Sequence, residues 1–172
     1  MKIFLKLLAI FILNINLSAN DFDLGMEEYK KGNYSESFNL FNKACYDGIS
    51  NGCTTLGRIY EEGFGLKQDY FKAVELYRKA CNAGDSNGCV LIGYMYFEGK
   101  GTKQDYFKAI ELYKKACNTG NSCGCQYLGF MYEQGYGSKQ NKQKAKEFYS
   151  MACDAKLEKG CKSYKELKEQ GF

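Results

Sequence analysis

Residues 53–81 read CTTLGRIYEEGFGLKQDYFKAVELYRKAC, and residues 89–117 read CVLIGYMYFEGKGTKQDYFKAIELYKKAC. The two stretches agree at most positions when they are offset by 36 residues, and residues 125–153 continue the pattern. A period between about 20 and 50 residues is typical of solenoids, whose stacked units cannot bury their apolar faces alone. The repeat therefore predicts an array of small stacked units.

The second half of each repeat has the spacing of an amphipathic helix. In residues 69–80, apolar and aromatic residues recur every three or four positions, as expected for one buried helix face. They are Tyr70, Ala73, Val74, Tyr77 and Ala80. Asp69 precedes this run and predicts an N-terminal cap, because its side chain can accept a hydrogen bond from a backbone N–H of the first turn.

The first half of the repeat predicts a shorter helix, Cys53–Glu62. Its buried stripe would contain Leu56, Ile59 and Tyr60, and Gly57 stands where a side chain would hold the neighbouring helix away. The Gly-x-Gly that follows predicts the connection between the two helices. A phosphate-binding loop would need a preceding strand and a third glycine in register, which this sequence lacks.

Eight of the nine cysteines form four pairs, each with a spacing of eight residues. The pairs are Cys45/Cys53, Cys81/Cys89, Cys117/Cys125 and Cys153/Cys161. Zinc sites favour closer Cys-x-x-Cys ligand pairs, whereas regularly spaced cysteines in an exported chain indicate disulfides. Each bridge would join the end of one helix to the start of the next. It would close a loop of about nine residues and contribute roughly 2–3 kcal/mol.

Cys123 is left over by this pairing. An odd cysteine in an exported protein indicates an intermolecular bridge or a reactive thiol, and an unpaired, partly buried residue is an equal alternative. A swapped Cys117–Cys123 bridge also stays open, although the periodicity favours Cys125 as the partner. A dimer linked through Cys123 is therefore one hypothesis for a partner.

These patterns together predict an all-α fold. We expect an α/α solenoid, wound as a right-handed superhelix, of about four disulfide-stapled helix hairpins and a C-terminal capping helix. The expected hairpins lie at about residues 22–45, 53–81, 89–117 and 125–153, and the charged capping helix at 161–171.

The N-terminus predicts export. Residues 1–19 contain Lys2, Lys6 and a short apolar run that ends before Ala19, as in a secretory signal peptide. We expect the remaining residues 20–172 to form a single repeat domain that is secreted or periplasmic and has no membrane span after signal removal.

The composition excludes several classes of function. The chain contains no histidine, which removes Ser-His-Asp and Cys-His catalysis and His-ligated metals. Its 24 basic and 20 acidic residues give a net charge of +4 without a basic block, so nucleic-acid binding is not expected. The sequence predicts neither a metal site nor a cofactor.

A ligand-binding groove is the site that the repeat predicts. In stacked helix pairs the first helices line the concave face, where positions beside the packing stripe vary. Three such positions in three repeats give Thr54, Arg58, Glu61, Val90, Tyr94, Phe97, Gln126, Phe130 and Glu133. Exposed rings of Tyr94, Phe97 and Phe130 would anchor an extended peptide or a peptidoglycan-like ligand. The alternative is that some of these rings complete the core.

The pattern Leu-Gly-x-x-Tyr-x-x-Gly-x-Gly, followed by Asp-x-x-Lys-Ala-x-x-x-Tyr-x-Lys-Ala-Cys, resembles the Sel1-like repeat, a relative of the tetratricopeptide repeat. With Cys-x7-Cys in each unit, residues 22–171 resemble the Helicobacter cysteine-rich protein family. Asn141 and Lys142 replace the Asp-Tyr of the earlier units. The resemblance implies an exported protein of disulfide-linked helix pairs. It also implies penicillin binding with weak β-lactam hydrolysis, or a role towards host proteins.

The residues themselves supply no β-lactamase motif. A serine β-lactamase needs a lysine three residues after the serine, and none of the serines has one. A metallo-β-lactamase is excluded by the absence of histidine. Glu61, Glu98 and Glu133 recur as ordinary solvated helix residues, so no catalytic residue stands out. Hydrolysis is implied by the resemblance alone, and the residues favour a non-catalytic binding scaffold.

Overall fold

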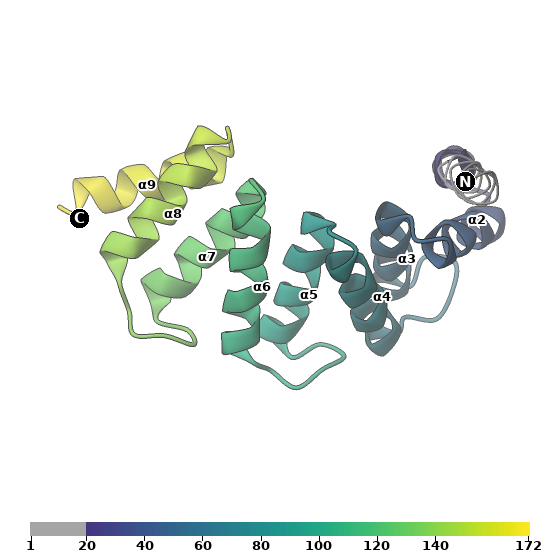
Figure 1. The fold of residues 1–172 in the computed structure, drawn as a ribbon, viewed down its shortest axis with the longest axis horizontal. Coiled ribbons are helices and arrows are strands. Elements are labelled where there is room, and N and C mark those ends of the chain that lie inside the picture. The colour runs from purple at the N-terminus through teal and green to yellow at the C-terminus, as the bar shows by residue number, and fades with distance from the viewer. Residues whose placement is uncertain (1–19) are drawn as a thin grey trace, which may run out of the picture. The chain divides into compact units, whose positions relative to one another are not determined.

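The computed structural model describes residues 20–172, and no strand occurs among them (Figure 1). Residues 20–31 are helical, and eight further helices of 12 or 13 residues follow. These are α2 (Tyr34–Tyr46), α3 (Ser50–Glu62), α4 (Tyr70–Asn82), α5 (Ser86–Glu98), α6 (Tyr106–Asn118), α7 (Ser122–Gln134), α8 (Lys142–Asp154) and α9 (Glu158–Glu169). The all-α prediction is confirmed. The predicted signal peptide lies outside the described residues.

The chain divides into two compact units, one ending at Asp85 and the other beginning at Ser86. In the first unit, α3 packs against both α2 and α4. In the second unit, each of the helices α5 to α9 packs against the next one, α5 also contacts α7, and α7 contacts α9. Within the second unit, the first helices of successive repeats therefore form a row, as expected for helices that line one face (Figure 1).

The two helices of a repeat have equal length, and the prediction of a shorter first helix was wrong. Helix α3 begins at Ser50, three residues before Cys53, and has 13 residues, as α4 has. The Asn51-Gly52 pair is typical of a turn, but Gly52 lies inside the helix. A Cβ atom there would lie 2.9 Å from the Cβ of Ala44, so the glycine allows the first turn of α3 to lie against the end of α2.

Gly57 allows the two helices of a repeat to approach each other. A Cβ atom at Gly57 would lie 2.6 Å from the Cε1 atom of Tyr77 on α4, which is too close for any side chain. Tyr77 is fully buried beneath this glycine. The same relation recurs between Gly93 and Tyr113 and between Gly129 and Tyr149. The predicted role of Gly57 is thus confirmed.

Three side-chain contacts fix the connection between the helices of a repeat. Asp69 accepts a 3.1 Å hydrogen bond from the backbone N–H of Lys72 and caps α4, as predicted. Gln68 donates a 2.7 Å hydrogen bond to the carbonyl oxygen of Glu61, near the end of α3. The Lys72 ammonium lies 4.9 Å from the centre of the Tyr60 ring. The contacts recur at Asp105, Gln104 and Lys108/Tyr96, and at Asn141, Gln140 and Lys144/Tyr132.

Disulfides join the end of one helix to the beginning of the next. The Cα atoms lie 4.5 Å apart in Cys45–Cys53, 4.6 Å in Cys117–Cys125 and 4.3 Å in Cys153–Cys161. Cys81 and Cys89 are also disulfide-bonded. The predicted disulfide set is confirmed, and Cys125 rather than Cys123 is the partner of Cys117.

Helix α9 covers the last repeat with a charged outer face. Its Leu167 is buried with Ala145 and Tyr149 of α8. Lys165 and Lys168, which take the repeat positions of Gly57 and Tyr60, are exposed. The predicted C-terminal helix is confirmed, although it runs over Glu158–Glu169 rather than 161–171, and its capping role stays a prediction that these charged side chains support.

Candidate functional site

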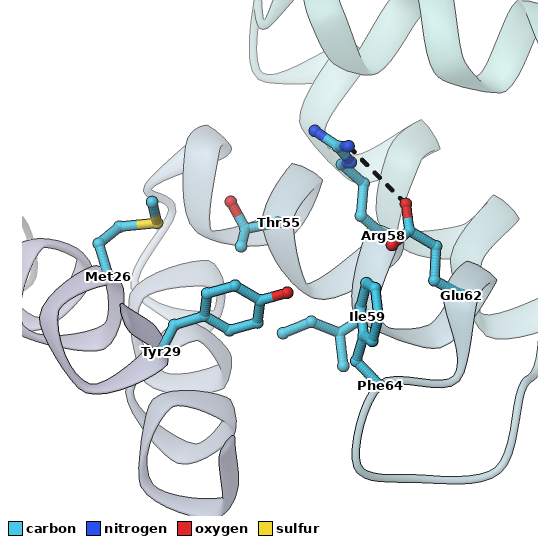
Figure 2. Close-up of a pocket in the computed structure, with 7 residues that line it drawn as sticks. All are labelled: Met26, Tyr29, Thr55, Arg58, Ile59, Glu62 and Phe64. Carbon is cyan, nitrogen blue, oxygen red and sulfur yellow. Dashed lines mark ion pairs between the residues drawn. The ribbon is translucent and has the colours of Figure 1, made fainter. Parts of the chain in front are cut away.

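Arg58, one of the predicted groove residues, lines a pocket of the first unit (Figure 2). The pocket has a volume of about 210 Å³ and is formed by residues of the helical segment 20–31, of α3 and of the loop after α3. Its lining residues are Met26, Tyr29, Thr55, Arg58, Ile59, Glu62 and Phe64. Four of these side chains are apolar or aromatic. Arg58 and Glu62 add opposite charges, with 3.7 Å between Nη2 and Oε1.

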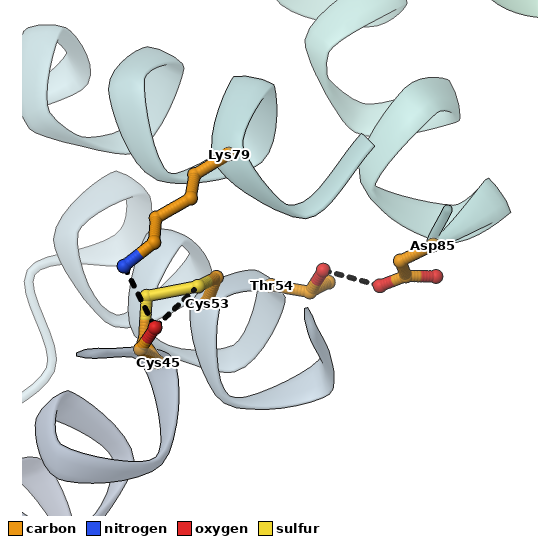
Figure 3. The surroundings of a disulfide bond; sticks show 5 residues. All are labelled: Cys45, Cys53, Thr54, Lys79 and Asp85. Atoms are coloured by element: carbon orange, nitrogen blue, oxygen red, sulfur yellow. Dashed lines mark hydrogen bonds between the residues drawn. A yellow bond between two sulfur atoms is a disulfide. The ribbon is translucent and has the colours of Figure 1, made fainter. Parts of the chain in front are cut away.

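Thr54 is buried, and its side chain links α3 to the loop that follows α4. Its Oγ1 donates a 2.5 Å hydrogen bond to Oδ2 of Asp85 (Figure 3). In the same region, the Lys79 ammonium donates a 2.7 Å hydrogen bond to the carbonyl oxygen of Cys45, whose sulfur is bridged to Cys53. Thr54 is therefore engaged in packing α3 against the residues that follow α4, and it offers little surface to a ligand.

Glu61 and Glu133 accept hydrogen bonds from buried tyrosines. The Tyr77 hydroxyl donates to Oε2 of Glu61 at 2.6 Å, and the Tyr149 hydroxyl donates to Oε2 of Glu133 at 2.7 Å. Burial, together with the neighbouring carboxylate, raises the pKa of both phenols well above the usual range. These two carboxylates are thus half-buried parts of a structural contact, which corrects their description as ordinary solvated residues.

The middle repeat lacks this contact. Phe97 stands at the repeat position of Glu61, and the hydroxyl of Tyr113 is buried without a hydrogen-bond partner among the described residues. The Tyr113 ring is instead stacked on Tyr127, with 5.1 Å between the ring centres. Burial raises the pKa of Tyr113, and the nearby Tyr127 adds to the shift. With phenylalanine in place of glutamate at this repeat position, the buried Tyr113 hydroxyl lacks the carboxylate that Tyr77 and Tyr149 bind.

The remaining predicted groove residues of the second unit fall into two groups. Val90 and Gln126 are buried, and Gln126 donates a 3.4 Å hydrogen bond to Oγ of Ser163 on α9. Tyr94 and Phe130 are half-buried, as is Phe97. The Lys100 ammonium lies 5.1 Å from the centre of the Tyr94 ring. Among the predicted positions of this unit, the half-buried ones are thus the second and third of each repeat, and all of them except Glu133 are aromatic.

Phe97 and Phe130 lie within a cluster of four half-buried rings, here called the ring cluster: Phe97, Tyr106, Phe130 and Tyr136. Phe97 contacts the other three, with ring centres 5.5 Å from Tyr106, 6.0 Å from Phe130 and 5.5 Å from Tyr136. Tyr136 also lies 5.0 Å from Tyr106 and 5.8 Å from Phe130. The rings come from α5, α6, α7 and the loop after α7, so one aromatic surface joins two repeats of the same unit.

Sequence reasoning missed Tyr106 and Tyr136 in the ring cluster and Phe64 in the pocket. Tyr136 and Phe64 occupy the same repeat position, between the two glycines of Gly-x-Gly, where the middle repeat has Lys100. A variable residue between two constant glycines was the signal available. The Gly-x-Gly was interpreted only as a loop between two helices, so the side chain between its two glycines was not considered as part of a site.

Besides the pocket and the ring cluster, residues 20–172 contain a free thiol, but neither a cluster of metal-binding side chains nor a helix that could span a membrane. Within residues 20–172, no group of three or more cysteine, aspartate or glutamate side chains is arranged to hold a metal ion. Cys123 is a free, exposed thiol on α7. No helix in the described range is both long and apolar enough to cross a membrane.

Hairpins of two thirteen-residue helices, linked by disulfides at a constant interval and followed by a charged C-terminal helix, define a disulfide-linked helical repeat protein. The Sel1 repeat family model matches residues 22–49, 51–85, 86–121 and 124–157. The chain belongs to the Sel1 repeat family.

Two curated relatives are both named "Putative beta-lactamase HcpE". The protein of Helicobacter pylori strain 26695 is 47% identical over 75 residues, which cover 38% of this chain and 21% of the relative. That of strain J99 is 54% identical over 46 residues, which cover 27% of this chain and 13% of the relative. The chain thus spans about a fifth or less of the length of these relatives.

Solved structures agree with the fold. A Sel1 repeat protein from Oxalobacter formigenes has a TM-score of 0.76 and 28% identity, over 83% of this chain and 60% of that one. Helicobacter pylori cysteine rich protein B has a TM-score of 0.60 and 29% identity, over 74% of this chain and 91% of that one. The predicted solenoid class and the resemblance to the Helicobacter cysteine-rich protein family are confirmed.

Proposed function

We propose that the chain is a non-catalytic scaffold that binds an apolar segment of a protein partner on the ring cluster of its second unit. The observation that carries this proposal is the packing of four half-buried rings across two repeats, in which Phe97 and Tyr136 each contact the other three. Aromatic side chains held in fixed positions are good anchors, because they bury a large apolar area at a small cost in side-chain entropy. Repeat proteins of this kind commonly bind partners along such extended surfaces.

The proposed place of action is the periplasm or the extracellular space. Structural disulfides persist in oxidising compartments and are rare in the cytosol. Three bridges with spacing eight and two further bonded cysteines support this assignment. The predicted signal peptide at residues 1–19 points in the same direction.

Selection from a random peptide display library tests the binding proposal. The oxidised protein is expected to enrich peptides with aromatic or leucine residues, and Phe130→Ala and Tyr136→Ala should each reduce their binding at least tenfold. Phe107→Ala is the matched control, because Phe107 is 71% exposed on α6 and does not belong to the ring cluster. Thermal unfolding of each variant separates lost binding from lost folding. Enrichment that is equal in the Tyr136 variant and the wild type would overturn the proposal.

Penicillin binding with slow β-lactam hydrolysis is the second candidate, because the relatives carry the name beta-lactamase. The residues give it less support, since no serine is followed by lysine at the third position and two of the recurring glutamates are engaged with buried tyrosines. A chromogenic cephalosporin decides between the candidates. Turnover that copurifies with the oxidised protein and disappears on reduction would favour the hydrolase. An absorbance change no faster than in buffer without protein would exclude it.

A further inference from the structure

The pocket of the first unit has the size of one amino-acid side chain (Figure 2). Its volume of about 210 Å³ exceeds that of an apolar protein cavity of about 150 Å³ that binds benzene. It is smaller than the roughly 300–1,000 Å³ of pockets for drug-sized ligands. Met26, Ile59 and Phe64 line it together with the ring of Tyr29. A branched or aromatic side chain is therefore the apolar group that fits.

Arg58 and Glu62 bring two opposite charges to the same pocket. Their closest atoms, Nη2 and Oε1, are 3.7 Å apart, whereas a charge-assisted hydrogen bond of this type is about 2.7–2.9 Å long. The side chains are 62% and 39% exposed, so water screens their attraction. Both groups are consequently open to ligand charges that offer shorter contacts.

This charge pair is not part of the repeated scaffold. The repeat positions of Arg58 hold Tyr94 and Phe130 in the later repeats, and those of Phe64 hold Lys100 and Tyr136. The later repeats keep their helices and glycines without it, so the fold does not require a cation at this place. Of the pocket residues, Thr55, Arg58 and Phe64 differ from their counterparts in both later repeats, whereas Glu62 recurs once, as Glu98.

We infer that this pocket binds a free apolar α-amino acid as its zwitterion. The side chain would enter the apolar part, the carboxylate would pair with the Arg58 guanidinium, and the ammonium would pair with Glu62. A ligand with a carboxylate alone would place its charge beside Glu62 and be repelled. The terminal residue of a peptide carries either the ammonium or the carboxylate at its α-carbon, but not both. A free amino acid carries both and can therefore pair with Arg58 and Glu62 at once. This site is separate from the ring cluster and goes beyond the proposed function.

Titration calorimetry or saturation-transfer NMR with L-leucine and L-phenylalanine tests this inference. Both should bind saturably. N-acetyl-L-leucine, which lacks the ammonium, and L-leucinamide, which lacks the carboxylate, should bind at least tenfold more weakly, as should L-leucine to the Arg58→Ala variant. Arg78→Ala, on α4 and outside the pocket lining, should bind like the wild type.

Two further variants keep the test specific. Glu62→Gln should lose affinity for L-leucine and gain affinity for N-acetyl-L-leucine, because it removes both an attraction and a repulsion. Thr55→Trp should fill the pocket and abolish binding while thermal unfolding shows a folded protein. Absence of saturable binding of both amino acids, or binding of N-acetyl-L-leucine and L-leucinamide as tight as that of L-leucine, would overturn the inference. Either result would leave peptide binding at the ring cluster unaffected, since that site is tested by its own variants.

Discussion

The phenol of Tyr77 on α4 donates a 2.6 Å hydrogen bond to the carboxylate of Glu61 on α3, and this bond ties the two helices of one repeat together. Tyr77 is fully buried, and its ring fills the space that the missing side chain of Gly57 leaves. Tyr149 and Glu133 repeat the bond in the last full hairpin, whereas the middle hairpin has lost it.

Removal of the Tyr77 hydroxyl should therefore destabilise the protein. We expect Tyr77→Phe to lower the free energy of unfolding by about 1.5–3 kcal/mol, the usual contribution of a hydrogen bond to a charged group. Tyr113→Phe is the matched control, because it removes a buried hydroxyl that has no partner within residues 20–172, and it should be neutral or stabilising by about 1 kcal/mol. Urea unfolding measures both, and equal losses in the two variants would contradict this account.

Alkaline pH should unfold the protein through its buried tyrosines. Burial raises the pKa of Tyr77, Tyr113 and Tyr149 above the value of about 10 that an unfolded tyrosine has. A raised folded-state pKa means that the native state holds the proton more tightly, so this stability is fully present below pH about 10 and is lost as pH rises towards the folded pKa. Absorbance at alkaline pH should show these phenols ionising only together with unfolding. Ionisation of all tyrosines in a still helical protein would contradict the prediction.

Lys156 is a strained position that substitution should relieve. It has a φ of 62°, and its repeat positions in the earlier hairpins hold glycines with φ of 92°, 93° and 85° at Gly48, Gly84 and Gly120. A left-handed conformation costs an ordinary residue about 1–2 kcal/mol. Glycine avoids this cost but loses more backbone entropy on folding, which offsets about 0.5–1 kcal/mol of the gain. Lys156→Gly should thus stabilise the protein by about 0.5–1 kcal/mol.

Gly120→Ala is the control for Lys156→Gly, because a Cβ atom there would meet nothing within 4 Å and the substitution changes the backbone preference alone. It should destabilise by about 1 kcal/mol. Thermal unfolding of the two variants checks the signs. A stabilised alanine variant or a destabilised glycine variant would refute the assignment of strain.

The disulfide between Cys153 and Cys161 should be more easily reduced than the bridges Cys45–Cys53 and Cys117–Cys125. Both of its cysteines are half-buried, whereas the pairs Cys45/Cys53 and Cys117/Cys125 are at most 3% exposed. A thiolate must reach a sulfur atom to open the bond, so access sets the order of reduction. After Cys123 has been blocked, mild reductant, a second alkylating reagent and mass spectrometry should label the C-terminal pair first. Earlier labelling of Cys117 and Cys125 would contradict this order.

Much of the fold could be predicted because its determinants are local and repeated. The cap at Asp69 and the close approach at Gly57 follow from residue type and spacing, and the structure confirms both. The start of α3 at Ser50 could not be predicted, because Gly52 is in the helix owing to its contact with Ala44 of another helix. Spacing along one segment does not reveal such a contact.

The candidate site could be predicted only in part. Phe97 and Phe130 follow from the variable positions of the repeat, but the burial of Val90 and Gln126 depends on the distance between neighbouring helices. The pocket could not be predicted, because Met26 and Tyr29 belong to the first hairpin. That hairpin departs from the 36-residue register.

The central claim is that a partner segment binds at the ring cluster, and mapping the bound peptide onto the protein tests it most directly. NMR of the oxidised protein with the most enriched peptide should show contacts between peptide protons and the rings of Phe97, Phe130 and Tyr136. These contacts should disappear in Phe130→Ala and persist in Phe107→Ala. A peptide that contacts Phe107 instead, or that binds the Phe130 variant unchanged, would contradict the claim.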